Sequence, residues 1–245
     1  MRNIWTIAKR ELNLLFISPI AYITLIVFLL TLSIFFYIYL SYAIQNQQYI
    51  NIMDPILQLI PFPLLFLAVP AMTMRSVAEE KRSGTIEFLL TAPVRDWELI
   101  VGKWLGVFLF FLIALAVTFI YPLILNFLVK PGIDLAAIAT GYLGLILLAS
   151  AMTAIGIAMS SLFSNQIAAL FATLGVIILF WIIGSLAQSI EGLGAEILTG
   201  MSLTTHLYDT FMAGILDLKD ILYYISFTVF ALFIGKTAIE IRRWA

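Results

Sequence analysis

The longest uncharged stretch of the chain covers residues 135–190 and reads LAAIATGYLGLILLASAMTAIGIAMSSLFSNQIAALFATLGVIILFWIIGSLAQSI. Its 56 residues contain no Asp, Glu, Lys or Arg. A helix needs about 20 apolar residues to cross the hydrocarbon layer of a bilayer, so this stretch is too long for one crossing and long enough for two. The small polar segment 160–165 divides it. We therefore predict two membrane-spanning helices, at 136–159 and 166–189.

The charges on either side of this stretch divide the rest of the chain in the same way. We predict four further spans, at 20–43, 56–74, 104–128 and 220–240. The last of these reaches spanning length if Lys236 extends its ammonium group to the membrane interface. Three prolines, Pro61, Pro63 and Pro70, are expected to kink the second span. The fold class is therefore an all-α membrane protein with six transmembrane helices.

The composition excludes most other classes of protein. Hydrophobic residues make up 63% of the 245 residues and charged residues 11%, against about 45–50% and about 25% in soluble domains. A cytosolic enzyme, a nucleic-acid binder and a disordered chain are excluded, and no nucleic-acid partner is expected. With no cysteine and one histidine, the chain is expected to hold no disulfide and no metal.

The basic residues orient the six spans. An even number of spans leaves both termini on one side of the membrane, together with residues 75–103 and the turn at 160–165. That side carries 11 of the 13 Lys and Arg residues. Because basic residues accumulate on the cytoplasmic side, we predict cytoplasmic N and C termini in a cell (inner) membrane.

The chain reads as one transmembrane domain, 1–245, in six parts. These are 1–19 (interface helix), 20–74 (spans one and two), 75–103 (cytoplasmic loop), 104–189 (spans three to five), 190–219 (outer helical segment), and 220–245 (span six and the tail). In the first part, apolar residues alternate with charged ones, as in a helix that lies on the membrane surface. Ser18 and Pro19 end that helix and open the first span.

The loop 75–103 holds 10 of the 27 charged residues. Ser76 and Glu79 have the spacing of a capping box that starts a short helix, and Gly84 ends it. Residues 85–90 form a second helical turn, and Asp96 caps the helix that leads into span three. A chain that only turns round needs fewer residues, so the loop either docks a partner or is a solvated connector.

The outer segment 190–219 carries more apolar residues than a free loop, so we expect short re-entrant helices. His206, the one histidine, is interpreted as a structural hydrogen bonder or helix cap in preference to a ligand. The sequence Gly235-Lys236-Thr237 lacks the earlier glycine of a phosphate-binding loop, because position 230 is Phe. We expect no nucleotide or catalytic site in the chain, which is therefore not an enzyme.

No charged residue lies inside spans one to five, which disfavours an ion-coupled carrier. A pathway for a hydrophobic or amphipathic solute is compatible with this pattern. If transport is active, its energy comes from another subunit.

The order of these features, together with the stretch EEKRSGTIEFLLTAP at 79–93, resembles an ABC-2 type transporter permease over essentially the whole chain. Residues 214–224 and 240–244 resemble the subgroup that includes the permeases of gliding motility and of nitrous-oxide-reductase maturation. Leu207 stands where that pattern has an aromatic residue after the histidine.

The resemblance implies a dimer of permeases, with a second copy or a homologue, in which each subunit binds a separate cytoplasmic ATPase. The ATPase would hold ATP and Mg²⁺, so no cofactor is expected in this chain. Docking would use the first cytoplasmic loop as a coupling helix, with these candidates: Glu79, Glu80, Lys81, Arg82, Gly84, Thr85, Glu87, Leu89, Leu90 and Pro93. The interface helix would contribute Trp5, Lys9, Arg10 and Glu11.

The resemblance also implies a transport path at the dimer interface. Candidate path residues are Tyr22, Thr31, Tyr37, Thr173, Trp181 and Gln188. His206 and Asp217 are the candidates in the outer segment, where an extracytoplasmic accessory protein is a further candidate partner. Two functions stay open: an exporter permease, and a non-transporting membrane anchor of an ATPase-driven assembly such as a motility or secretion machine.

Overall fold

The computed structural model describes residues 2–46, 60–87, 94–128, 133–187, 189 and 191–244. Its secondary structure in these ranges consists of helices, with no strand. Six helical segments are long and apolar enough to cross a membrane, and they are Pro19–Tyr42, Pro61–Arg82, Asp96–Leu128, Leu135–Leu162, Gln166–Leu186 and Leu218–Ile241. The prediction of an all-α protein with six spans is confirmed. The beginning predicted for span two, 56–59, lies outside the described residues.

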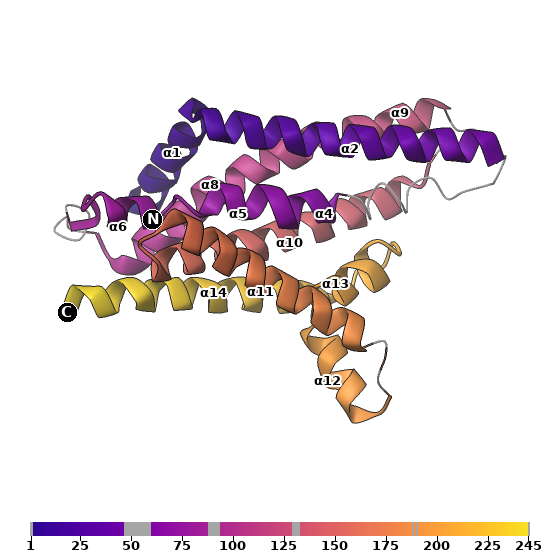
Figure 1. Cartoon of the computed structure of the whole chain (residues 1–245). Helices are drawn as coiled ribbons and strands as arrows, with labels where there is room; N and C mark the ends of the chain where they lie inside the picture. Colours follow the sequence, from indigo (N-terminus) through magenta and orange to yellow (C-terminus); the bar gives the residue numbers. More distant parts are fainter. Residues whose placement is uncertain are drawn as a thin grey trace.

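The helices form an elongated bundle in which both chain ends lie at the same end (Figure 1). In chain order they are α1 (Arg2–Ile17), α2 (Pro19–Asn46), α4 (Pro61–Pro63), η1 (Leu64–Ala68), α5 (Val69–Thr73), α6 (Ala78–Arg82), α8 (Asp96–Thr118), α9 (Ile120–Leu128), α10 (Leu135–Leu162), α11 (Gln166–Ala187), α12 (Leu193–Met201), α13 (Leu203–His206), η2 (Leu207–Phe211) and α14 (Leu218–Trp244). The end that holds both termini also holds α6, and α12 projects from the bundle near its other end.

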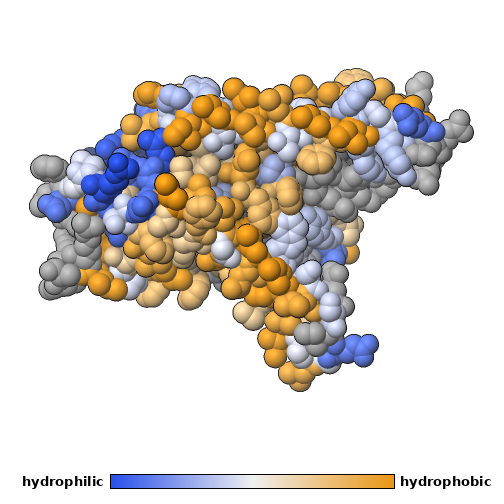
Figure 2. Space-filling view, viewed as in Figure 1, coloured by the Kyte–Doolittle hydropathy of each residue, from blue (hydrophilic) through white to orange (hydrophobic). Residues whose placement is uncertain are grey.

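Helix α10 is the centre of the bundle. It is the most buried span, with 72% of its apolar window inside the protein, against 17% for the span in α2. Close packing on α10 depends on small residues, because a Cβ atom at Gly156 would lie 2.1 Å from Thr73 Oγ1 on α5. The apolar surfaces of the outer helices are left uncovered, and Figure 2 shows them as a broad hydrophobic band. Hydrophilic residues gather at the end that carries α1 and α6.

The second span is irregular where its prolines lie. Residues Leu64–Ala68 form a π-helical turn between Pro63 and Pro70, and the backbone N–H of Val69 donates to the Leu64 carbonyl five residues earlier. Pro70 has no N–H to continue the α-helical pattern. The expected departure from a regular helix in this span therefore takes the form of a π turn.

The connection between spans two and three is shorter than the predicted loop 75–103. Helix α8 begins at Asp96, so residues 96–103 form its first two turns. The prediction that Asp96 caps this helix is wrong. Arg95 occupies the cap position, and its backbone N–H donates to Glu98 Oε2 at 3.1 Å, so Asp96 is already the first helical residue.

Candidate functional site

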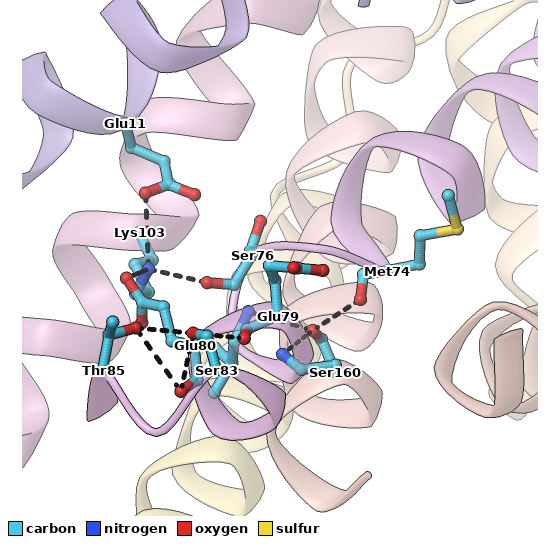
Figure 3. Close-up of polar contacts among 11 residues, drawn as sticks. Glu11, Met74, Ser76, Glu79, Glu80, Ser83, Thr85, Lys103 and Ser160 are labelled. Atoms are coloured by element: carbon cyan, nitrogen blue, oxygen red, sulfur yellow. Dashed lines mark hydrogen bonds and ion pairs between the residues drawn. The ribbon is translucent and has the colours of Figure 1, made fainter. Parts of the chain in front are cut away.

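A buried ionic junction lies at the end of the bundle that holds α1 and α6, and its centre is Lys103 of α8 (Figure 3). Lys103 Nζ is 2.8 Å from Glu80 Oε1 on α6 and 3.3 Å from Glu11 Oε2 on α1. It also donates to the Ser76 carbonyl at 2.6 Å. The side chain of Lys103 is 3% exposed, that of Glu11 12% and that of Glu80 16%. We call these four residues the ionic junction.

Close packing of α1 on α8 brings Glu11 to the junction. A Cβ atom at Gly102 would lie 2.7 Å from Ile7 Cβ, and one at Gly106 would lie 2.6 Å from Glu11 Cβ. Two glycines four residues apart on α8 therefore form the surface on which α1 packs. One face of the amphipathic N-terminal helix thus packs on protein, where Ala8 is buried, while Trp5 on another face is 58% exposed.

Helix α6 is fixed on its other side by the end of α10. Ser160 Oγ accepts hydrogen bonds from the backbone N–H groups of Val77 and Ala78, at 3.1 and 3.0 Å. The same hydroxyl donates to the Met74 carbonyl at 3.1 Å. These bonds satisfy N–H groups at the start of α6 that a local cap would otherwise serve. Lys81 Nζ adds a hydrogen bond to the Ser161 carbonyl at the end of α10.

The predicted capping box at Ser76 is therefore wrong. Val77 occupies the cap position of α6 without a side-chain cap, and among the described residues the Ser76 hydroxyl has no hydrogen-bond partner. A serine 84 positions later in the chain, Ser160, supplies the hydroxyl instead.

The docking candidates of the loop divide into inward and outward residues. Glu80 and Lys81 bond to the chain itself, whereas Arg82, Thr85 and Glu87 are exposed. Gly84 ends α6 with a φ of +74°, a backbone conformation that glycine adopts without strain, which agrees with its predicted role. The next part of the loop is anchored by a fully buried isoleucine at position 86. The candidates Leu89, Leu90 and Pro93 lie outside the described residues.

The interface-helix candidates divide in the same way. Glu11 belongs to the ionic junction and is 9% exposed as a whole residue. Lys9 and Arg10 are exposed, as is Trp5.

The transport-path candidates lie in different environments. Tyr22 and Tyr37 on α2 are 51% and 70% exposed. Thr31 and Thr173 each donate to a carbonyl of their own helix four residues earlier, and Thr173 is fully buried. Trp181 packs on Phe66, with ring centroids 4.5 Å apart. Gln188 lies outside the described residues.

In the outer segment His206 joins three pieces of chain. Its Nδ1 lies 2.6 Å from Asp220 Oδ1 on α14, and its Nε2 lies 3.3 Å from the Gly200 carbonyl on α12. Its ring stacks on Tyr223, with centroids 4.2 Å apart. These contacts agree with the interpretation of His206 as a structural hydrogen bonder. Asp217 accepts from the Lys219 N–H at 2.9 Å and so caps α14.

Two residues that organise the site were missed by sequence reasoning. Lys103 was counted as a charge at the edge of the loop, and Ser160 as part of a polar turn. The only signal at Lys103 is its place directly before 26 uncharged residues, which marks a membrane boundary but not a buried pairing. Its partner Glu11 is 92 positions away in the chain, so no local pattern connects them.

This geometry joins four helices at one point: α1 and α8 through the ionic junction, α6 through Glu80, and α10 through Ser160. Helix α6 therefore contacts both the Lys103–Glu11 pair, which reaches the N-terminal helix, and Ser160 of the central span. Six helices of spanning length with such a junction at one end define a multi-pass helical membrane protein.

Residues 5–240 match the family model of the ABC-2 family transporter proteins, so the chain belongs to this family. It is a membrane permease of the ABC transporter type, and the family implies an ABC ATPase as partner in general. No curated protein matches the chain.

Proposed function

We propose that the chain is the permease subunit of an ABC exporter and that a separate cytoplasmic ATPase docks on the exposed part of its first loop. The observation that supports this proposal is the ionic junction, which fixes α6 within the same loop that carries the exposed residues Arg82, Thr85 and Glu87. A loop that served only to connect two spans would gain nothing from a buried lysine paired with two carboxylates, because burying such charges is costly.

The proposed coupling has two routes. Movement of the ATPase displaces α6, and the Glu80–Lys103–Glu11 contacts carry this displacement to α1 and α8. The bonds from Val77 and Ala78 to Ser160 carry it to α10. The π-helical turn in span two lies between α6 and the outer half of that span, where a helix with an irregular turn bends at low cost.

The remaining parts of the proposal concern orientation and assembly. The termini and α6 face the cytoplasm of an inner membrane, in accord with the basic residues at that end. Two permease copies form the transport path, and ATP with Mg²⁺ binds to the ATPase and not to this chain, which has no catalytic site. Within the family, we place the chain near the permeases of gliding motility and nitrous-oxide-reductase maturation.

The test is purification of the tagged chain from its own membranes, with ATP hydrolysis and the bound ATPase measured together. We expect an ABC ATPase to co-purify and to be lost in Gly84→Trp, whose side chain would project from the docking face. Gly84→Asn is the matched control, because asparagine tolerates a positive φ and adds little bulk. Glu196→Lys, an exposed change at the other end, should also retain the complex.

A complex that survives Gly84→Trp would overturn the docking site. A complex that forms and hydrolyses ATP but moves no solute across proteoliposome membranes would favour the membrane-anchor function over the exporter.

A further inference from the structure

A cavity of about 370 Å³ adjoins the ionic junction, between α1, the start of α2 and the end of span two. Its volume falls within the range of about 300–1,000 Å³ that is usual for small-molecule sites. It lies beside the beginning of the first span and the end of the second. The ionic junction forms only part of its wall.

Three of the polar residues that line the cavity each carry a buried side-chain oxygen without a hydrogen-bond partner among the described residues. Ser76 Oγ, Glu79 Oε2 and Glu80 Oε2 are buried, and among the described residues none of them has a hydrogen-bond partner. The residue Ser76 is only 6% exposed. A buried carboxylate oxygen without a donor is costly, so these atoms indicate a missing group that donates hydrogen bonds.

Two arginine residues, Arg10 and Arg75, also line this cavity. Neither is part of an ion pair among the described residues. Arginine binds phosphate oxygens well, because its planar fork presents several donors. The cavity lining in the described part of the chain therefore combines two arginines without ion-pair partners, which suit an anionic group, with oxygens without hydrogen-bond partners, which suit a cationic donor.

The remaining wall is apolar, and includes Leu14 and Ile20 near the junction of α1 with α2 and Met72 of α5. An apolar wall beside a zwitterionic floor matches an amphiphile. A divalent metal does not match, because no three His, Cys, Asp or Glu side chains of the described residues form a metal site.

We propose that this cavity binds one phospholipid whose head group carries a primary ammonium. The phosphate lies against Arg10 and Arg75, the ammonium donates to Glu79, Glu80 and Ser76, and the acyl chains leave along the apolar wall. A bound lipid would then fill the space between the N-terminal helix and the docking loop. This site is separate from the proposed transport path and does not require the proposed function.

The test measures lipid binding to the full, delipidated chain in detergent by native mass spectrometry, without any ATPase. Three lipids with identical acyl chains are compared: phosphatidylethanolamine, phosphatidylcholine and phosphatidylglycerol. We expect phosphatidylethanolamine to bind at least about tenfold more tightly than either, because methylation removes the N–H donors and the glycerol head group lacks the ammonium.

Variants locate the site. Glu79→Gln should abolish the preference for phosphatidylethanolamine over phosphatidylcholine. Arg75→Gln should weaken the binding of all three lipids by about tenfold. Glu196→Gln and Arg2→Gln, exposed residues that do not line the cavity, should bind as the parent does. An unchanged melting temperature and elution volume must accompany each variant, and Glu79→Asp, which keeps the charge, should retain the preference.

Equal affinity for the three lipids, or a preference that survives Glu79→Gln, would overturn the assignment. So would displacement of the lipid by soluble glycerophosphoethanolamine at equal concentration, which would assign the site to a free zwitterion. Displacement by a lysine-rich peptide with no lipid preference would assign it to a basic segment of a protein partner.

Discussion

At the scale of the residue, Lys103 of α8 holds helices α1 and α6 together, because it pairs with Glu11 of α1 and with Glu80 of α6. Its ammonium group is surrounded by Glu80, Glu11 and the Ser76 carbonyl, and it is almost inaccessible to water. The two carboxylates come from different helices, so the lysine joins α1 to α6 across α8. Removing a partner from such a buried group leaves an uncompensated charge, which is more costly than the pair is favourable.

Lys103→Met should therefore lower the free energy of unfolding by about 3–5 kcal/mol, because Glu11 and Glu80 lose their counter-ion in a buried site. The measurement is a denaturation curve in mixed micelles, followed by tryptophan fluorescence. Lys219→Met, an exposed lysine at the other end, is the matched control and should change stability by less than about 0.5 kcal/mol. Equal denaturation curves for Lys103→Met and Lys219→Met would contradict the conclusion that the Lys103 ion pairs stabilise the bundle.

At the scale of the element, α1 is a part of the folded bundle as well as an amphipathic surface helix. Ala8 and Glu11 are its buried residues, and they lie against Gly106 of α8, while Ile7 lies against Gly102. The amphipathic pattern predicted the helix and its two faces. It did not predict that the covered face lies on another helix, because lipid and protein present the same apolar surroundings to such a face.

Gly106→Ala should detach α1 from α8. The new Cβ would lie 2.8 Å from the Ala8 carbonyl oxygen, so the backbone of α1 must move, and Glu11 moves with it. We expect faster amide exchange over residues 2–17 by at least about tenfold, since local opening becomes easier. Hydrogen–deuterium exchange with peptide resolution measures this effect.

The control for that variant is Gly175→Ala on α11, where a Cβ would meet nothing within 4 Å. It replaces a helix-interior glycine without a clash and should leave exchange in α1 unchanged. Slow exchange over residues 2–17 in Gly106→Ala would show that the close packing on α8 is not what holds the helix.

At the scale of the whole molecule, the bundle has one polar end and a broad apolar band (Figure 2). Both termini and α6 lie at the same end (Figure 1). From the distribution of basic residues we propose that this end faces the cytoplasm.

This orientation makes a prediction that single cysteines test, because the chain has no cysteine of its own. In spheroplasts, a membrane-impermeant maleimide should label Glu196→Cys and leave Thr6→Cys and Thr85→Cys unlabelled, while in inverted vesicles the pattern should reverse. All three positions are exposed on the protein, so access depends on the side of the membrane alone. Labelling of Thr85→Cys in spheroplasts would place the docking loop outside and contradict the proposed function.

The sequence by itself determined the membrane class, the number of spans and most of their bounds. Membrane insertion depends on hydropathy summed over about 20 neighbouring residues, and this is a local quantity. The break at 163–165 between α10 and α11 followed from local polarity, and the end of α6 at Gly84 followed from backbone preference.

The tertiary structure alone decided which residues form the ionic junction, which hydroxyl caps α6 and where α1 packs on α8. The Glu11 and Lys103 side chains are 92 positions apart, and Ser160 is more than 80 positions from the N–H groups that it accepts from. Local sequence patterns predict Ser76 as the helix cap and Lys103 as a residue at the membrane boundary, because such patterns depend only on neighbours in the chain. Which hydroxyl reaches a free N–H, and which carboxylate meets a buried ammonium, depends on how the helices pack against one another.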